Sequence, residues 1–199
     1  MVILPPRLFP SAGYYRQILN STRVCVDIGA RYDKRCKAVH RYDIVDARGP
    51  LSLTVPMCKP HGMEGAATWA DVAVSVHDRW WQRHIVALES AYGRTPYFEF
   101  IIDRFDRVFR SPHHWENEPS AIDIIREANK AVFSVLSLDD PVDYRRVELS
   151  AYTPIEEISE PYWQVRQHIH GFTGGLSVLD LLFNLGPEAW WYLKNENTH

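Results

Sequence analysis

The alternation of apolar and polar residues predicts a sheet in the first third of the chain. Residues 23–28 and 51–56 alternate in the way of half-buried strands, and residues 42–47 lead into a turn at a Gly-Pro pair. This order predicts a hairpin between residues 42–47 and 51–56. Two further short strands are predicted at residues 72–76 and 147–150.

Apolar residues three and four positions apart predict helices in the rest of the chain. The clearest pattern runs from Arg79 to Tyr92, and Gly93 follows it where a helix often ends in a left-handed residue. One amphipathic helix is predicted to follow Pro96. Further helices are predicted to begin after Ser11, to begin after Ser120, to cover residues 176–185, and to end the chain near residues 187–191.

Three serines stand where helix caps are expected. Ser11 and Ser120 each precede the first turn of a predicted helix, and a serine side chain can accept a bond from a free amide there. Ser177 and Asp180 have the spacing of a capping box. A capping box explains Asp180 without any role in chemistry.

The order of these elements predicts an α/β fold, with an α+β arrangement as the alternative. We expect one domain over residues 1–199, because domains of this length are common and no linker divides the chain. Its central mixed sheet is expected to come largely from the N-terminal third, with the helices packed on it.

Composition narrows the class of protein. The hydrophobic fraction of 46% and the charged fraction of 24% are those of a folded globular protein. A net charge of −3, with both signs interspersed, argues against a nucleic-acid partner. No apolar run approaches the ~20 residues of a membrane span, and the first residues lack the pattern of a signal peptide. We therefore expect a cytoplasmic protein.

Cysteine and histidine spacing gives no sign of a metal site. The three cysteines are odd in number and contain no CxxC pair, so neither a disulfide framework nor a structural zinc is predicted. Cys58 and His61 lack the second half of a zinc motif. No cofactor can be named from the residues.

His84 is the first candidate for chemistry. It shares the inward face of the predicted helix with Trp81 and Leu88, where an unpaired polar ring is costly. As a functional group it would be a general acid or base with a pKa near neutrality. As a structural group it would be a core histidine bonded to a carbonyl or a carboxylate. Both interpretations are open.

His40 and Arg41 stand at the start of a predicted strand. Neighbouring strand residues point to opposite faces, so only one of them can face a given cleft. His40 is a second candidate catalytic histidine. Arg41 is the candidate for holding a carboxylate or phosphate, because its guanidinium can bind such groups with two bonds. The structural alternative is an ion pair with Asp43 or Asp46.

Ser11 and Tyr14 lie where a loop enters a helix, and free amides at such a point can hold an anion. They are therefore candidate substrate-binding residues. The glycine-rich nucleotide motifs are absent. N-capping is the simpler interpretation of Ser11.

Four stretches of the chain together resemble the WbqC-like family. The third is the most specific, with Trp81, His84, Tyr92, Pro96 and Phe98 in the family's order. The form seen here, with His40 where asparagine is usual in the family, resembles the Bacteroides-type version. The four stretches are residues 9–15, residues 40–44 with 51–56, residues 81–98, and residues 171–187.

The resemblance implies a role among bacterial O-antigen and polysaccharide genes but carries over no catalytic residues. It implies modification of an activated sugar or transfer of an acyl or aminoacyl group, with a sugar or nucleotide-sugar substrate. Trp81 and Tyr92 would then be aromatic substrate contacts, and core packing is the alternative. The competing hypothesis is a non-catalytic binding or scaffold protein of envelope biogenesis, with a protein partner or a second copy of the chain.

Overall fold

Three short strands form a parallel sheet in this computed structural model, which describes residues 1–58, 66–109, 115, 117–148, 151–158 and 160–194. They are β1 (Val2–Leu4), β2 (Val24–Asp27) and β5 (Val142–Arg145), with β2 in the centre. All four residues of β2 are buried, as expected for a central parallel strand that is covered on both faces.

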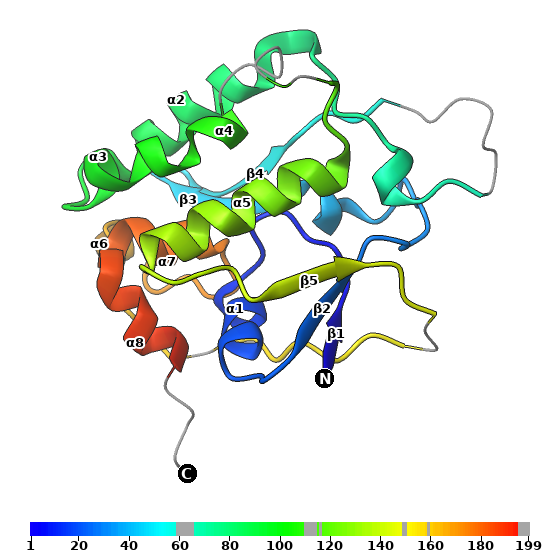
Figure 1. Ribbon diagram of the computed structural model, residues 1–199. Coiled ribbons are helices and arrows are strands. Elements are labelled where there is room, and N and C mark those ends of the chain that lie inside the picture. The colour runs from blue at the N-terminus through cyan, green and yellow to red at the C-terminus, as the bar shows by residue number, and fades with distance from the viewer. Residues whose placement is uncertain (59–65, 110–114, 116, 149–150, 159, 195–199) are drawn as a thin grey trace.

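The first two strands and the helix between them make a β-α-β unit. Parallel neighbours cannot be joined by a tight turn, so the chain crosses back through α1 (Ala12–Leu19). The loop from β1 into α1 therefore starts at the carboxyl end of β1. Figure 1 shows α1 in blue beside the three strands.

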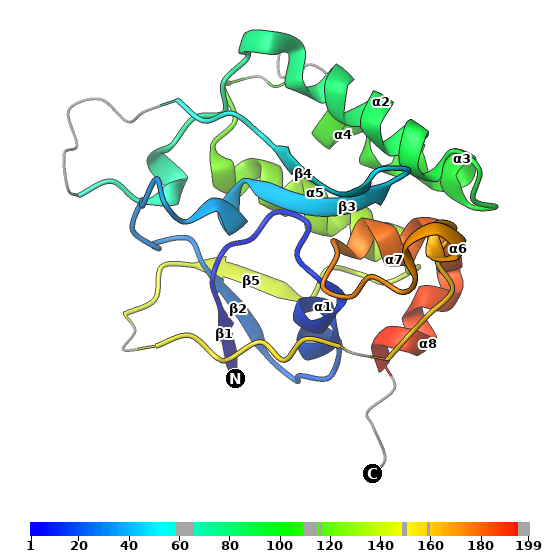
Figure 2. The same ribbon diagram turned by 180° about the vertical axis from the view of Figure 1, so that it is seen from behind.

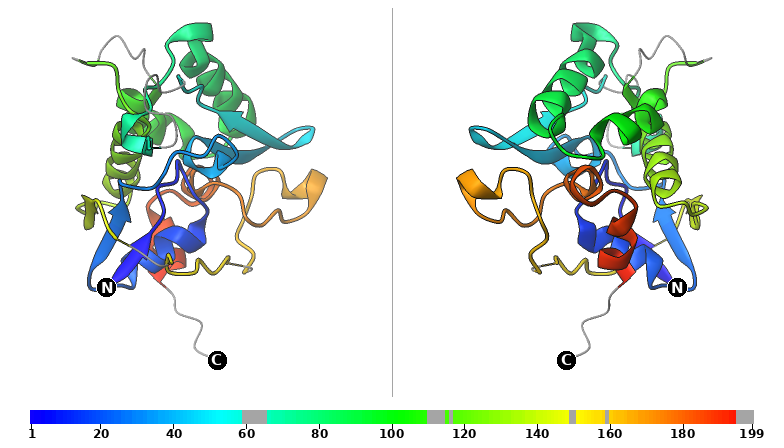
Figure 3. Two further views of the ribbon diagram at one scale, coloured as in Figure 1. Left: turned by 90° about the vertical axis from the view of Figure 1, so that its right-hand side faces the viewer. Right: turned by 90° about the vertical axis from the view of Figure 1, so that its left-hand side faces the viewer.

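A separate antiparallel hairpin is formed by β3 (Arg41–Asp46) and β4 (Gly49–Thr54). At the start of β3 exposed and buried residues alternate, so Arg41 and Asp43 face outward while Tyr42 and Ile44 enter the core. Gly49 has a φ of 121°, which a residue with a side chain rarely adopts. Figure 3 shows that the hairpin and α6 (Gln167–His170) project on the same side of the molecule.

Helices enclose these strands. α2 (Trp80–Tyr92) packs on β3, and α5 (Ala121–Val135) crosses in front of the hairpin and above the parallel sheet in the view of Figure 1. The remaining α-helices are α3 (Phe98–Ile101), α4 (Asp106–Phe109), α7 (Val178–Leu185) and α8 (Ala189–Lys194). Short 3-10 turns cover Lys37–Val39, Trp69–Asp71, His77–Arg79, Ile102–Phe105 and Gly186–Glu188.

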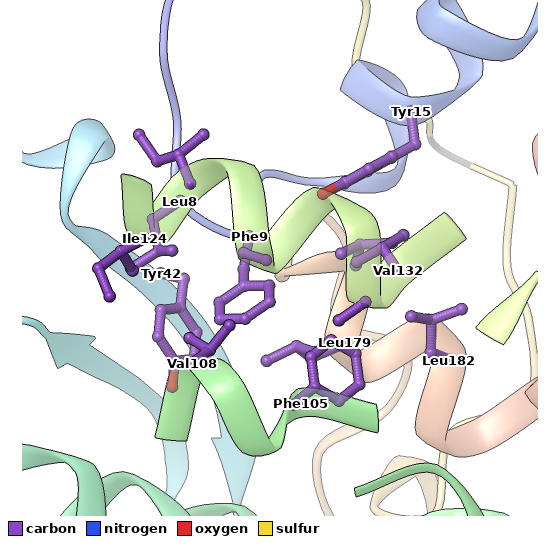
Figure 4. Packing of buried hydrophobic residues seen from close by; sticks show 14 of the residues in the cluster. Leu8, Phe9, Tyr15, Tyr42, Phe105, Val108, Ile124, Val132, Leu179 and Leu182 are labelled. Atoms are coloured by element: carbon purple, nitrogen blue, oxygen red, sulfur yellow. The ribbon is translucent and has the colours of Figure 1, made fainter. Parts of the chain in front are cut away.

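One hydrophobic cluster joins both sheets and the helices. Phe9 lies at its centre in Figure 4, with its ring 5.1 Å from Tyr42 and 5.6 Å from Phe105. Val132 of α5 and Leu179 of α7 approach from the other elements (Figure 4). The loop after β1 thus anchors the core through Phe9. None of the described helices is both long enough and apolar enough to cross a membrane.

The α/β class is confirmed, and most of the strands come from the N-terminal third. Parallel and antiparallel pairs lie in two sheets rather than in one mixed sheet. The fifth strand lies at Val142–Arg145. Of the strand predicted at 147–150, residues 147–148 are not in a strand and residues 149–150 lie outside the described part. The strand predicted at 72–76 is wrong, because Ala73 and Val74 make single bridges to two different segments.

The predicted helices differ from the structure in two details. The helix after Pro96 is broken into α3, a 3-10 turn and α4, although its apolar face remains buried. Gly93 is right-handed, with a φ of −58°. A side chain at Gly93 would put Cβ 2.6 Å from the Glu89 carbonyl oxygen, so close approach rather than handedness favours glycine there.

Candidate functional site

A pocket of about 250 Å³ opens where the chain leaves β1 and enters α1. We call it the anion pocket. Its walls come from the loop after β1, the 3-10 turn before β3, the start of β3, and the loop that leads into α7. The charged and hydroxyl-bearing residues of its wall, besides Tyr42, are Arg7, Ser11, Lys37, Arg41, Asp43, Glu157 and Ser177.

Backbone hydrogen bonds hold these segments together. The Val178 amide donates to the Pro10 carbonyl at 2.8 Å, and the Ser177 amide donates to the Asp43 carbonyl at 2.8 Å. The Leu8 amide donates to the Ala38 carbonyl at 3.2 Å. These bonds fix the starts of α1, α7 and β3 around one space, and Figure 2 shows the three segments side by side.

Three cations line the pocket. Arg41 is exposed on β3, and its Nε donates to Thr54 Oγ1 at 2.9 Å. Neither it nor Arg7 or Lys37 forms a salt bridge with any residue that the structure describes. The ion pair expected as the structural alternative for Arg41 is therefore not present among the described residues. Three guanidinium or ammonium groups that form no salt bridge with a described residue are suited to an anionic ligand.

Two carboxylates share the same wall. Asp43 lies two residues after Arg41 on the outward face of β3, and its Oδ1 accepts a hydrogen bond from the Ser52 hydroxyl. Glu157 is exposed and comes from the segment that passes the start of α1. The pocket therefore offers both charge signs to a ligand, with cations in excess.

Ser11 occupies the N-cap position of α1 but does not cap the helix through its side chain. Its Oγ is buried and has no hydrogen-bond partner in the described part of the chain. The Tyr14 amide, which a serine cap would bind, donates to the Ser11 backbone carbonyl at 3.1 Å instead. The predicted side-chain cap is wrong, and the hydroxyl of this pocket-lining residue has no described partner.

Tyr14 lies outside the pocket. Its ring is 1% exposed, and its hydroxyl donates to the Pro5 carbonyl at 3.0 Å.

The segment that carries Glu157 comes close to Gly13 of α1. An added Cβ at Gly13 would lie 2.0 Å from the Glu156 carbonyl oxygen, so only glycine allows this approach.

His84 is enclosed in the core, 4% exposed. Its Nε2 lies 3.3 Å from the Thr54 carbonyl oxygen, and its Nδ1 lies 3.0 Å from the Tyr42 hydroxyl. A carbonyl only accepts, so Nε2 carries the proton and Nδ1 accepts from Tyr42. Burial lowers the pKa of His84 to about 4, which keeps the ring neutral. These are the contacts of a satisfied core histidine.

The other candidates from the sequence also lie away from the pocket. His40 is buried with its Nδ1 2.9 Å from the Val55 carbonyl oxygen, and burial lowers its pKa. Trp81 packs edge-on against Trp80, with ring centroids 5.9 Å apart. Tyr92 is fully buried. Of the residues singled out from the sequence, the structure brings only Ser11 and Arg41 into one pocket.

Asp180 has a role that the sequence did not reveal. Ser177 Oγ accepts from the Leu179 amide at 3.2 Å, and Asp180 turns into the core instead of completing a capping box. There it accepts hydrogen bonds from Tyr92, Tyr162 and Gln164. Burial raises its pKa, although the hydrogen-bond donors oppose the rise. An acid in a helix whose other residues are apolar except Asn184 was the signal for this network.

Arg7, Lys37, Glu157 and Ser177 were also missed as site residues. Arg7 lies three residues after β1 in a β-α-β unit, a place where ligands often bind, but the sequence did not predict β1. The other three reach the pocket only through the tertiary fold. Among the described residues no three His, Cys, Asp or Glu side chains gather as a metal site would require.

Comparison with known proteins agrees with the family resemblance. The model of the WbqC-like protein family matches residues 5–153, a span that includes the loop after β1 and the start of β3. Searches of curated proteins and of solved structures gave no match. Because the matched residues make up most of the 199-residue chain, this protein belongs to the WbqC-like protein family.

Proposed function

We propose that the protein binds a small anionic substrate in the anion pocket and modifies it in the cytoplasm. The reaction class that the family resemblance favours is modification of an activated sugar, or transfer of an acyl-type group, in bacterial surface-polysaccharide biosynthesis. The observation that carries this proposal is the convergence of Arg7, Lys37 and Arg41 on one pocket without a salt bridge to a described residue.

The chemistry of the pocket supports recognition of an anion. A hydrogen bond to a charged group contributes about 1.5–3 kcal/mol, so three such bonds amount to roughly 4.5–9 kcal/mol, which spans millimolar to micromolar binding. The pocket lies outside the carboxyl end of a parallel strand, where α/β proteins commonly bind ligands. Asp43 and Glu157 are the lining carboxylates that could accept a proton from a substrate hydroxyl or amine.

A second candidate function is binding without catalysis, as a scaffold or carrier in envelope biogenesis. The contacts of His84 favour it, because a neutral ring with both nitrogens occupied is no ready acid or base. In this alternative the anion pocket binds the same class of ligand but transforms nothing.

A thermal-shift screen tests the proposal. The panel contains nucleotide sugars, acyl-CoA, ATP and amino acids, tested on the wild type, on Arg41→Ala and on Arg48→Ala. Arg48 is an exposed cation outside the anion pocket and serves as the matched control. A ligand at 100 times its Kd adds ~2.7 kcal/mol, and each kcal/mol raises Tm by roughly 2–4 °C for a chain of this size.

We expect at least one anionic ligand to raise Tm in the wild type and in Arg48→Ala but not in Arg41→Ala. Mass spectrometry of the incubated ligand then separates the two candidates, since an enzyme changes the ligand mass and a carrier does not. Equal shifts in all three proteins would contradict the pocket assignment.

A further inference from the structure

The anion pocket contains two serines in equivalent places with unequal hydrogen bonding. Ser11 and Ser177 occupy the N-cap positions of two eight-residue helices and face each other across an isolated antiparallel bridge. Ser177 Oγ caps its helix by accepting from the Leu179 amide. Ser11 Oγ is buried and has no partner among the described residues.

An unpaired buried hydroxyl is unfavourable by about 1–3 kcal/mol, so a protein retains one where something else completes it. Ser11 lines the pocket together with the cations Arg7, Lys37 and Arg41. We propose that the inner end of the anion pocket holds a phosphoryl group of the ligand, to which Ser11 Oγ donates a hydrogen bond. This assignment rests on the proposed function and names the anion that the pocket takes.

The number and arrangement of donors favour a phosphoryl group over a carboxylate. A carboxylate has two oxygens in one plane, whereas a phosphoryl group has three strong acceptor oxygens spread in space. Ser11, Arg7, Lys37 and Arg41 reach the pocket from three different segments of the chain. Donors that come from several directions match a tetrahedral anion.

The N-termini of α1 and α7 also favour a phosphoryl group at this site. The N-terminus of a helix carries a partial positive charge that favours phosphate. In α7 the first amides are already used, because Val178 donates to Pro10 and Leu179 donates to Ser177. α7 therefore contributes only its dipole, while α1 also places the Ser11 hydroxyl at the site.

The test is a calorimetric titration of the full chain with inorganic phosphate, pyrophosphate and acetate at constant ionic strength. Ser11→Ala is the test variant, and Ser120→Ala, at the N-cap of α5 outside the pocket, is its matched control. We expect phosphate and pyrophosphate to bind the wild type and acetate to bind far more weakly. Ser11→Ala should weaken phosphate binding about tenfold, the effect of one hydrogen bond to a charged group.

The stability of the two ligand-free variants adds a second readout. Ser11→Ala removes an unpaired hydroxyl and should leave Tm unchanged or raise it. Ser120→Ala removes a working cap and should lower Tm, with phosphate affinity within about threefold of the wild type because Ser120 does not line the pocket. A structural role for Ser11 would give the opposite pattern, a lower Tm with unchanged phosphate binding, and would overturn the inference.

Other outcomes separate this inference from the proposed function. Acetate binding as tight as phosphate binding, and lost in Arg41→Ala, would overturn the phosphoryl assignment but leave the anion pocket standing. Binding of all three anions that is insensitive to Arg41→Ala would overturn both. The same is true if none of the three anions binds the wild type.

Discussion

The two ring nitrogens of His84 show how a residue that looks catalytic in the sequence is explained by its contacts. The sequence placed this ring correctly on the buried face of α2 and required it to have a partner. The partners, Tyr42 and Thr54, lie on the hairpin, more than twenty-five positions away along the chain. Position on a helix face is a local property and could be predicted, whereas the identity of the partners depends on the fold.

The pH dependence of stability should report the buried state of His84. Its pKa falls from 6.5 in the unfolded chain to about 4 in the folded protein because the ring is buried. The unfolded state therefore binds the proton first, and stability present above pH 6.5 is lost as pH falls through 4. The full loss is about 3 kcal/mol, from roughly 1.4 kcal/mol per pKa unit.

Urea unfolding measured from pH 7.5 to pH 4 checks this expectation. His84→Gln keeps a donor and an acceptor but does not titrate, so its stability should depend less steeply on pH, by up to one proton. Part of the dependence should remain, since burial also lowers the pKa of His40. Parallel pH profiles for the variant and the wild type would show that His84 is not the buried neutral ring described above.

The serines that precede α1 and α5 show how far the neighbouring residues predict a helix cap. Ser120 caps α5 as expected, and Asp123 completes a capping box with it. Ser11 has Tyr14 rather than an acid three positions on, and its side chain caps nothing because the backbone carbonyl already binds the Tyr14 amide. A serine alone therefore predicts a cap less well than a serine with an acid three residues later.

At the scale of elements, prediction succeeded where local contacts determine the structure. α2, α5 and the β3–β4 hairpin each bury one face that repeats with the period of the element, so their residues could be predicted closely. β5 could not, because it pairs with β2 across more than a hundred residues. Its intermediate and exposed residues alternate without a strong apolar signal.

The contact between α1 and the segment that carries Glu157 gives a prediction about packing. Gly13→Ala should raise the helix propensity of α1, which alone would stabilise it by up to about 1 kcal/mol. However, the new Cβ would lie 2.0 Å from the Glu156 carbonyl oxygen, a backbone atom. Overpacking of this kind is unfavourable by about 1–3 kcal/mol, so we expect net destabilisation.

Urea unfolding measures the net effect, with Gly174→Ala as control. The nearest atom to a Cβ at Gly174 is on Phe172 at 3.6 Å, an ordinary contact, so that variant should fold with near wild-type stability. Gly13→Ala should also change pyrophosphate affinity. The segment that the new side chain would displace carries Glu157, which lines the pocket. A Gly13→Ala protein more stable than the wild type would show that the close approach is not maintained in solution.

For the whole molecule, the fold determines the site in a way that no single stretch of sequence reveals. The anion pocket combines the loop after β1, the start of β3, Glu157 and the loop before α7. Arg41 and Ser11 were chosen from the sequence for separate reasons, and the β-α-β unit and the hairpin bring them to the same space. The histidines that the sequence favoured lie in the core instead.

The most direct test of the anion pocket as the functional site is an amide ¹H–¹⁵N chemical-shift map during titration with pyrophosphate. We predict that the largest shifts occur at Ser11, Gly13, Arg41 and Ser177, and that they saturate together. Shifts confined to the exposed groove between α2 and the hairpin, at Arg48, Arg83 and Val86, would place the ligand elsewhere and contradict this assignment.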